Sequence, residues 1–253
     1  MAVQLDALLA YCENLMVPGK FRDYCPNGLQ VEGKPTIQRL VSGVTASQDL
    51  LDAAVAWQAD AILVHHGYFW KGEPEPVRGI KRKRLKTLLQ HDISLIAYHL
   101  PLDAHPVLGN NARLGAELGL ETTGPLELGN PDSIGLVGKL SEPQTAAEFS
   151  AHIAQVLGRE PLLIEGGDHP IHSVGWCTGG AQGYIEKAIA QGLDAFISGE
   201  VSEPTFHAAR ENGIHYIAAG HHATERYGAQ AMGEALANEF GLEHRFIDIN
   251  NPV

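Results

Sequence analysis

The sequence predicts an α/β fold made of two similar lobes, and three observations support this prediction. Short apolar runs alternate with helix-like segments along most of the 253 residues. Some runs, such as "AILV" at 61–64, are continuous in apolar residues, as are parallel strands that are covered on both faces. After Gly124 the alternation begins again, which indicates an internal duplication.

The first half reads as helix, turn and then strand, helix, strand, helix, strand. Leucines recur at helical spacing from Leu5 to Leu15, and Pro18 and Gly19 end that helix. A Pro-Asn-Gly turn lies within 25–33, and Ser47 is the expected N-cap of the second helix. The expected strands cover 39–46, 61–66 and 93–98, and the helices between them cover 47–59 and 80–92.

The second half repeats this alternation. Strands are expected at 134–140, 173–180, 193–200 and 214–222, with helices at 145–158, 181–192 and 204–213. Residues 56–67 match 188–200 in kind, and 91–103 match 212–225. We therefore expect one lobe at 1–125 and a second at 126–253, with the last strand, near 244–252, belonging to either lobe.

Composition and charge narrow the class of protein. The content of 44% hydrophobic and 19% charged residues is that of a globular protein, and no apolar run approaches a membrane span. The N-terminus lacks the features of a signal peptide, and the three cysteines form no CxxC motif, so a cytoplasmic location is expected. A net charge of −12 argues against nucleic acid as a partner.

Histidine and carboxylate side chains gather where predicted strands end, which is where open α/β sheets bind ligands. Strand by strand they are His65 and His66; His99, Asp103 and His105; and His221, His222 and Glu225. A single histidine at a strand end is more often a packed residue than a ligand. Three such strand ends favour a metal site, and imidazole nitrogen with carboxylate oxygen suits zinc, manganese, iron or cobalt equally.

The spacing after the last of these strands predicts a chelating pair. If a helix begins near His221, then His221 and Glu225 stand at i and i+4 on one helical face. His222 points about 100° away, so a supporting or structural role is expected for it.

The adjacent histidines His65 and His66 pose a separate question, because neighbouring strand residues point to opposite faces. Both bind metal only if the strand breaks there, which Gly67 makes easy, or if they serve two different ions. Two ions with this number of ligands require a bridging carboxylate, and Asp103 or Glu225 is suited to that role.

Several further stretches have two interpretations. The glycine-rich residues 177–183 either hold a phosphate on backbone amides or form a tight turn for close packing. The basic run 81–86 is either a solvated helix face or an attractor for a polyanionic substrate. Glu200 and His207 either support metal ligands or transfer protons, or have buried structural roles, and the structural roles are favoured. The aromatic residues 68–70 are expected to line a contact between lobes or subunits.

Five motifs together resemble those of the Nif3-like family, also known as GTP cyclohydrolase 1 type 2 homologues, in its short bacterial form. They are "PNGLQVEG", "ILVHHGYFW", "AYHLPLDAHPVLGNN", "CTGGAQGYIEKAIAQGLDAFISGE" and "AGHHATERYGAQAM". The resemblance implies the Nif3-like fold, a dinuclear metal centre with two divalent ions per chain, and a ring-shaped homohexamer. The metal ligands it implies are His65, His66, Asp103, His221 and Glu225.

The leading functional hypothesis is a dinuclear-metal hydrolase that acts on a nucleotide-like, phosphorylated small molecule. In a cyclohydrolase, water attacks C8 of guanine and the imidazole ring opens; in a phosphoesterase, water attacks phosphorus. The candidate catalytic residues that shuttle protons are His99 and His222. The alternative is a non-enzymatic, metal-binding oligomer that regulates partners or delivers metal.

Overall fold

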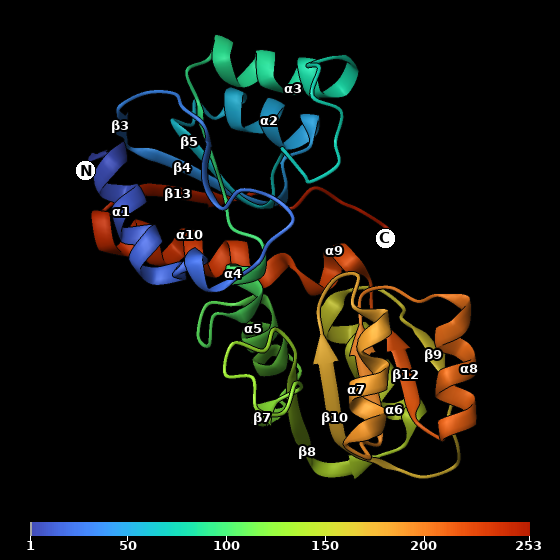
Figure 1. The fold of residues 1–253 in the computed structure, drawn as a ribbon. Coiled ribbons are helices and arrows are strands. Elements are labelled where there is room, and N and C mark those ends of the chain that lie inside the picture. Colours follow the sequence, from blue (N-terminus) through green and yellow to red (C-terminus); the bar gives the residue numbers. More distant parts are fainter. Residues whose placement is uncertain (1) are drawn as a thin grey trace. The chain divides into compact units, whose positions relative to one another are not determined.

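The computed structural model describes residues 2–253, which form two α/β units, so the predicted fold class is confirmed (Figure 1). The first unit contains the residues up to Leu102 together with Gly228–Asn250. The second contains Asp103–Tyr227 and Asn251–Val253. Each unit has its own sheet, with helices on both faces.

The sheet of the first unit has five strands in the order β13-β4-β5-β6-β2. They are β2 (Gly28–Val31), β4 (Arg39–Thr45), β5 (Ala61–His66), β6 (Ser94–Ala97) and β13 (Glu243–Phe246). The first four in spatial order are parallel, and β2 is antiparallel to β6. A separate two-stranded sheet joins β1 (Val3–Gln4) to β3 (Thr36–Ile37).

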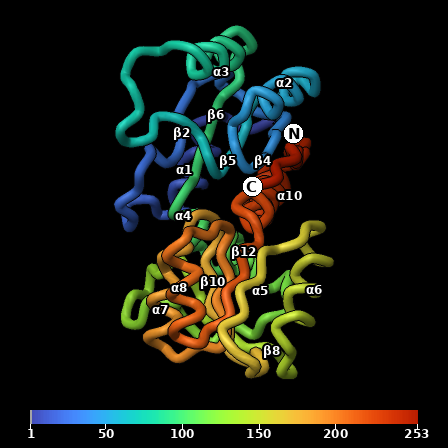
Figure 2. The backbone as a smooth tube through the Cα atoms, turned by 90° about the vertical axis from the view of Figure 1, so that its right-hand side faces the viewer, coloured from blue at the N-terminus to red at the C-terminus, as the bar shows by residue number. Residues whose placement is uncertain are grey.

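Helices cover both faces of this sheet (Figures 1 and 2). On one side lie α2 (Gln48–Ala56) and α3 (Gly79–Gln90), and on the other lie α1 (Leu5–Met16) and most of α10 (Arg226–Phe240). As predicted, the Ser47 side chain caps α2 by accepting a hydrogen bond from the Leu50 N–H (3.3 Å). The strands are buried on both sides, which explains their continuous apolar sequences.

The sheet of the second unit has six strands in the order β7-β8-β10-β11-β12-β9. They are β7 (Glu121–Pro125), β8 (Leu136–Gln144), β9 (Leu162–Ile164), β10 (Ile171–Cys177), β11 (Ala195–Ser198) and β12 (His215–Ala218). The central strands β10, β11 and β12 are parallel, whereas β7, β8 and β9 run antiparallel to their neighbours.

Helices also cover both faces of the second sheet (Figures 1 and 2). On one face are α5 (Asn110–Glu117) and α6 (Ala146–Leu157), and on the other are α7 (Ile185–Ala190) and α8 (Glu203–Asn212). The short helices α4 (Leu100–Ala104) and α9 (His221–Thr224) follow β6 and β12, respectively. A capping box between Thr145 and Glu148 begins α6, and Gly158 ends it in the left-handed conformation.

The two units share one topology, as the internal duplication predicts. The order β4-α2-β5-α3-β6 in the first unit corresponds to β10-α7-β11-α8-β12 in the second. In both units the three strands are parallel neighbours. A strand from earlier in the chain pairs antiparallel with the third of them: β2 with β6 in the first unit, and β9 with β12 in the second. Strand ends that carry the candidate ligands in one unit therefore have counterparts in the other.

The unit boundaries differ from the expected division at 125/126. Residues 103–125 belong to the second unit because β7 pairs with β8 and α5 packs on β10, where Gly115 leaves room for the Trp176 ring. The last strand, whose place was open, pairs with β4 in the first unit. Sequence periodicity identified these elements but carried no information about which sheet each one joins.

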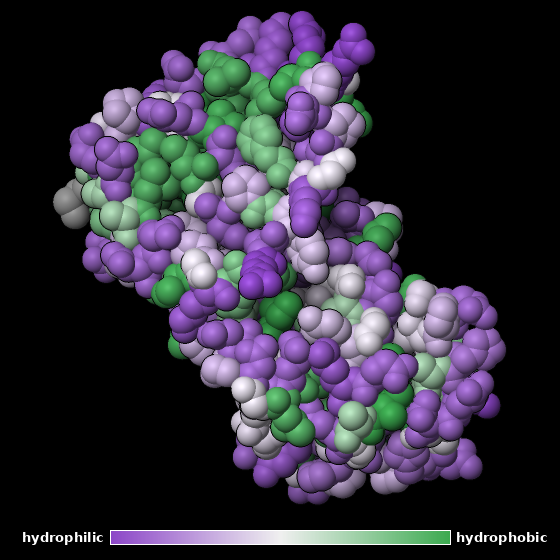
Figure 3. Space-filling view, in the orientation of Figure 1, coloured by the Kyte–Doolittle hydropathy of each residue, from purple (hydrophilic) through white to green (hydrophobic). Residues whose placement is uncertain are grey.

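The surfaces of the two units differ in the view of Figure 3. Hydrophilic side chains cover most of the visible face of the second unit, where hydrophobic areas are small and separate, whereas the first unit shows a larger hydrophobic area. None of the helices in residues 2–253 is long and apolar enough to cross a membrane.

Candidate metal-binding residues

The end of β5 carries His65 and His66, and His99 lies just past the end of β6. Ligand atoms of these three histidines lie within 4.8 Å of one another. The rings of His65 and His66 have centroids 4.5 Å apart, and those of His65 and His99 are 5.0 Å apart. The first unit therefore brings three imidazoles into one cluster.

The sequence analysis allowed both adjacent histidines to bind metal if the strand breaks there or if they serve two ions. The strand does not break there. Strand β5 continues through His66, which pairs with Thr45 of β4. The ladder to β6, however, ends at Val64, so both histidines extend past the end of the neighbouring strand. The two rings are tilted by 45° and lie close together there.

Hydrogen bonds to Nδ1 fix the orientation of these rings. Nδ1 of His65, which is fully buried, lies 3.0 Å from the carbonyl oxygen of Tyr98. Nδ1 of His66 lies 3.1 Å from the Thr45 hydroxyl. Such contacts on one ring nitrogen are typical of histidines that bind metal through the other.

Asp23, which the sequence analysis did not single out, holds His99. Its Oδ1 lies 2.6 Å from Nδ1 of His99, and its carboxylate also accepts hydrogen bonds from the Asn27 side chain and the Tyr24 and Leu100 amides. Burial raises the pKa of Asp23, but the hydrogen bonds from His99, Asn27 and Tyr24 and the charge of His99 lower it further, to about 2. Asp23 is therefore a fixed carboxylate that orients His99.

The aromatic residues after His66 pack largely within the first unit. Tyr68 is buried and donates to the carbonyl of Ala46 (2.8 Å), and the Trp70 ring stands edge-on to His99 with centroids 5.0 Å apart. Phe69 is 36% exposed and has φ +65°, a conformation that is rare for a bulky residue. Tyr68 is thus buried, Trp70 is partly buried and Phe69 is exposed.

In the second unit, His221 and Glu225 meet as the i, i+4 spacing predicts. Nε2 of His221 lies 3.1 Å from Oε2 of Glu225, which is buried. The helix, however, is not continuous: α9 ends at Thr224, Glu225 has φ −109° and ψ 9°, and α10 begins at Arg226.

Glu200 contacts the other nitrogen of the same ring. Its Oε1 lies 2.7 Å from Nδ1 of His221. Burial lowers the pKa of His221, but Glu225 and Glu200 raise it more strongly, to about 9. The structural role expected for Glu200 thus becomes a specific one, because it orients a candidate ligand. The other residue grouped with it, His207, pairs with Glu203 on the exposed surface of α8 (3.0 Å).

Asp103 lies in α4 and is buried in the second unit. Asn110 donates to its Oδ1 (2.9 Å), and the Thr178 hydroxyl lies 3.4 Å from the same atom. A carboxylate oxygen of Asp103 lies within 4.8 Å of one of Glu225. Two buried carboxylates this close are costly unless a cation or a proton lies between them, so their placement fits a divalent ion.

The glycine-rich turn 177–183 is shaped by these carboxylates. Gly179 has φ +68°, and a Cβ at this position would overlap Oε1 of Glu225. A Cβ at Gly180 would lie 3.6 Å from the Glu200 carboxylate. Negative groups on this turn disfavour a phosphate, so the close-packing interpretation is the better one.

The remaining histidines near the strand ends play other parts. Nδ1 of His105 accepts from the Val107 and Leu108 amides (3.2 and 3.0 Å), which closes a turn. His222 is buried in α9. Within residues 2–253, neither belongs to a group of three or more side chains placed to hold a metal.

The basic run 81–86 lies in α3, and its members face mostly solvent. Arg82, Lys83 and Lys86 are exposed, while Lys81 pairs with Glu73 (3.2 Å). A solvated helix face is thus the interpretation that the contacts support.

The donor set fits a borderline or hard divalent metal. His65, His66, His99 and His221 each have Nδ1 held by an oxygen, so each ring presents Nε2 in a fixed direction. Buried carboxylates supply oxygen donors. The cysteine that lies near His99 and Asp23 is Cys25, and burial and the charge of Asp23 raise the pKa of its thiol to about 12, which disfavours a thiolate ligand. Zinc, manganese, iron and cobalt all suit such donors.

Fold and side chains together define a class of two-unit α/β proteins with histidine–carboxylate clusters at their strand ends. Residues 3–252 match the model of the Duf34/NIF3 (NGG1p interacting factor 3) family, and the chain belongs to that family.

Similar proteins cover the whole chain. It is 61% identical to the GTP cyclohydrolase 1 type 2 homolog of Pseudomonas aeruginosa over 253 residues, 100% of both chains. The Vibrio cholerae protein of the same name is 56% identical over 99% of both. The solved structure of protein ybgI, described as of unknown function, is 51% identical and superposes with a TM-score of 0.95, covering 99% of this chain and 100% of that one.

Proposed function

We propose that the protein is a dinuclear-metal hydrolase that acts on a nucleotide-like substrate. The observation that carries this proposal is the set of four imidazoles held through Nδ1, two of them, His99 and His221, by carboxylates. Relatives named GTP cyclohydrolase 1 type 2 homolog support a nucleotide-like substrate.

The metal ligands in this proposal are the five residues given by the sequence spacing and the family resemblance. They are His65, His66, Asp103, His221 and Glu225, and together they bind two divalent ions per chain. When bound, such ions lower the pKa of water and stabilise negative charge on the attacked group. Asp103 and Glu225, whose oxygens lie within 4.8 Å, are the candidates for a bridging carboxylate.

His99 is the better of the two candidates for proton transfer. Asp23 accepts the Nδ1–H of His99 at 2.6 Å, which fixes the tautomer and leaves Nε2 to take up or release a proton. The edge-on Trp70 ring limits the movement of the imidazole. His222 is buried in α9, and we assign it the lesser role.

The test is turnover by the metal-loaded protein, screened over nucleoside triphosphates and phosphoesters. Asp103→Ala removes a buried proposed ligand and should abolish turnover, whereas Asp168→Ala changes an exposed carboxylate of the same unit and should leave it intact. A wild-type protein with full metal content and no turnover on any substrate would reject the hydrolase and favour the non-enzymatic metal-delivery or regulatory role.

We also propose that the chain forms a homohexameric ring. Family resemblance motivates this proposal, and the large exposed hydrophobic side chains of the first unit support it. They are Val17, Tyr24, Phe69, Val77, Ile80 and Leu89. Light scattering should give six times the chain mass of 27.2 kDa. Changing Phe69 and Trp70 together to Ser should lower that mass, and a monomeric wild type would refute the ring.

A further inference from the structure

The second unit contains a cavity of about 620 Å³ beside the residues that hold His221. Apolar side chains of Leu162, Val201 and Ala218 form part of its wall. Arg159 and Glu200 also line it. Since Glu200 contacts Nδ1 of His221, the cavity lies one side chain away from a proposed metal ligand.

Arg159 reaches this cavity through a space that a glycine provides. It follows Gly158, the residue that ends α6, and its guanidinium packs against the backbone of Gly220. Gly220 has φ +100°, and a Cβ there would overlap Nη1 of Arg159. The glycine directly before His221 is therefore required for the arginine to sit where it does.

One nitrogen of the guanidinium lacks an acceptor among the described residues. Nη1 of Arg159 is buried, and no atom of residues 2–253 accepts a hydrogen bond from it. A buried donor of a charged group that has no acceptor is costly, and an arginine in that state is a characteristic feature of an anion site. The fold here combines a required glycine with an arginine whose buried Nη1 has no acceptor in residues 2–253.

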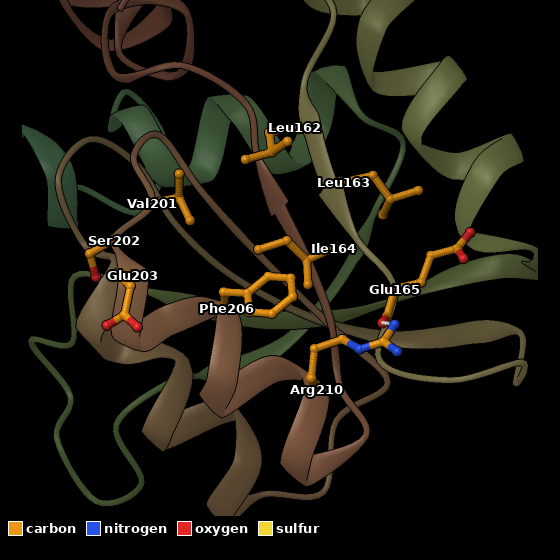
Figure 4. A pocket seen from close by; sticks show the side chains of 9 residues that line it. All are labelled: Leu162, Leu163, Ile164, Glu165, Val201, Ser202, Glu203, Phe206 and Arg210. Atoms are coloured by element: carbon orange, nitrogen blue, oxygen red, sulfur yellow. Dashed lines mark hydrogen bonds between the residues drawn. The ribbon is translucent and has the colours of Figure 1, made fainter.

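A neighbouring cavity of about 640 Å³ provides the contrast (Figure 4). Arg210 lines that cavity, and its Nη1 donates to the carbonyl oxygen of Glu165 at 2.8 Å. Leu162 and Val201 contribute to both cavities. Of these two arginines in one unit, Nη1 of Arg210 has an acceptor, whereas Nη1 of Arg159 has none among the described residues.

We propose that Arg159 anchors an oxyanion, a phosphate or a carboxylate, of a small molecule that occupies this cavity. The proposal deepens the proposed function and rests on it for the link to the metal ligands. Glu160 and Glu200 also line the cavity, so the molecule carries N–H or O–H donors as well as its anionic group. A nucleotide has this combination: an anion at one end and a donor-bearing ring at the other.

The experiment is calorimetric titration of the full-length protein as purified, with its metal content measured in parallel. The probes are GMP, inorganic phosphate, succinate and guanosine. Arg159→Gln should weaken binding of the oxyanion probes by about 10- to 100-fold, because a charge-assisted hydrogen bond is lost. Arg159→Lys should restore part of that loss, and the matched control Arg210→Gln should bind as wild type does.

The outcomes separate this proposal from the proposed function. Weaker binding of GMP and phosphate in Arg159→Gln supports a phosphate group, and weaker binding of succinate alone supports a carboxylate; guanosine should respond in neither case. Equal binding of every probe by wild type and Arg159→Gln, or no binding by wild type, overturns the anion site even if metal and turnover are present. If the wild-type protein has no metal or no turnover but its binding of the oxyanion probes still depends on Arg159, only the proposed hydrolase function is overturned.

Discussion

The two units use one strand arrangement but carry different chemical groups at equivalent places. The pairing of β5 with β6 ends at Val64, and the equivalent pairing of β11 with β12 ends at Ser198. Two residues after these positions stand His66 in the first unit and Glu200 in the second. In the first unit that position contributes an imidazole to the cluster. In the second it contributes a carboxylate that orients the imidazole of His221.

The groups that orient the candidate metal ligands also differ between the two units. Neutral oxygens, from Tyr98 and Thr45, hold His65 and His66 in the first unit. In the second unit, carboxylates surround His221 and hold its pKa near 9. Charged oxygens therefore orient the candidate ligand His221 of the second unit, whereas neutral oxygens orient His65 and His66 of the first.

The largest expected effect comes from removing either member of the pair in the second unit. His221→Ala and Glu225→Ala should each lose the same ion, because one turn of chain presents both side chains 3.1 Å apart. Elemental analysis after mild dialysis should find roughly two ions per wild-type chain and fewer in both variants. The control is His207→Ala, on exposed α8. The chelate model would be wrong if Glu225→Ala kept its full metal content while His221→Ala lost metal.

A smaller effect is expected from the groups that orient the rings, and it should differ between the units. Glu200→Gln removes a charged acceptor of His221 and should weaken metal binding by about 10- to 100-fold. Thr45→Val removes a neutral partner of His66 and should cost less than Glu200→Gln. Competition with a chelator measures both, with Glu203→Gln as the exposed control. Equal losses would show that the charge of the orienting group is unimportant.

The smallest expected effect concerns Asp23. It is measured as the pH dependence of the free energy of unfolding. Its pKa falls from 3.8 in the unfolded chain to about 2 in the folded one, so its carboxylate stabilises the fold above about pH 4 and loses this contribution as the pH falls towards 2. Asp23→Asn should cost about 2 kcal/mol at neutral pH. Denaturant unfolding from pH 7 to 2 should show the difference from wild type narrowing, and a constant difference would contradict the assignment.

Much of the fold and part of the site follow from local sequence patterns. Apolar runs located the central strands, and Ser47 correctly marked the start of α2. The i, i+4 spacing placed His221 beside Glu225 even though the helix breaks there, because a four-residue helix already turns the two side chains to one side. These features depend on residues that are close in the chain.

What escaped prediction depends on residues that are far apart in the chain. Asp23 and His99 are separated by 76 residues, and Glu200 and His221 by 21. Nothing in the motif around Asp23 signals its partner. Gly179 was visible as part of a glycine-rich turn, but only the fold shows that it makes room for Glu225. Long-range pairing likewise decided the unit boundaries.

The position of β13 has a consequence for synthesis of the chain. Its parallel partner β4 lies at residues 39–45, whereas β13 itself covers 243–246. A growing chain therefore exposes one open edge of β4 until residues 103–227 of the second unit and α10 have been made, although its other edge pairs with β5 much earlier. The first unit is thus completed only after residues 103–227 of the second have been made, and a ribosome that stalls before β13 leaves an unpaired strand edge rather than a finished domain.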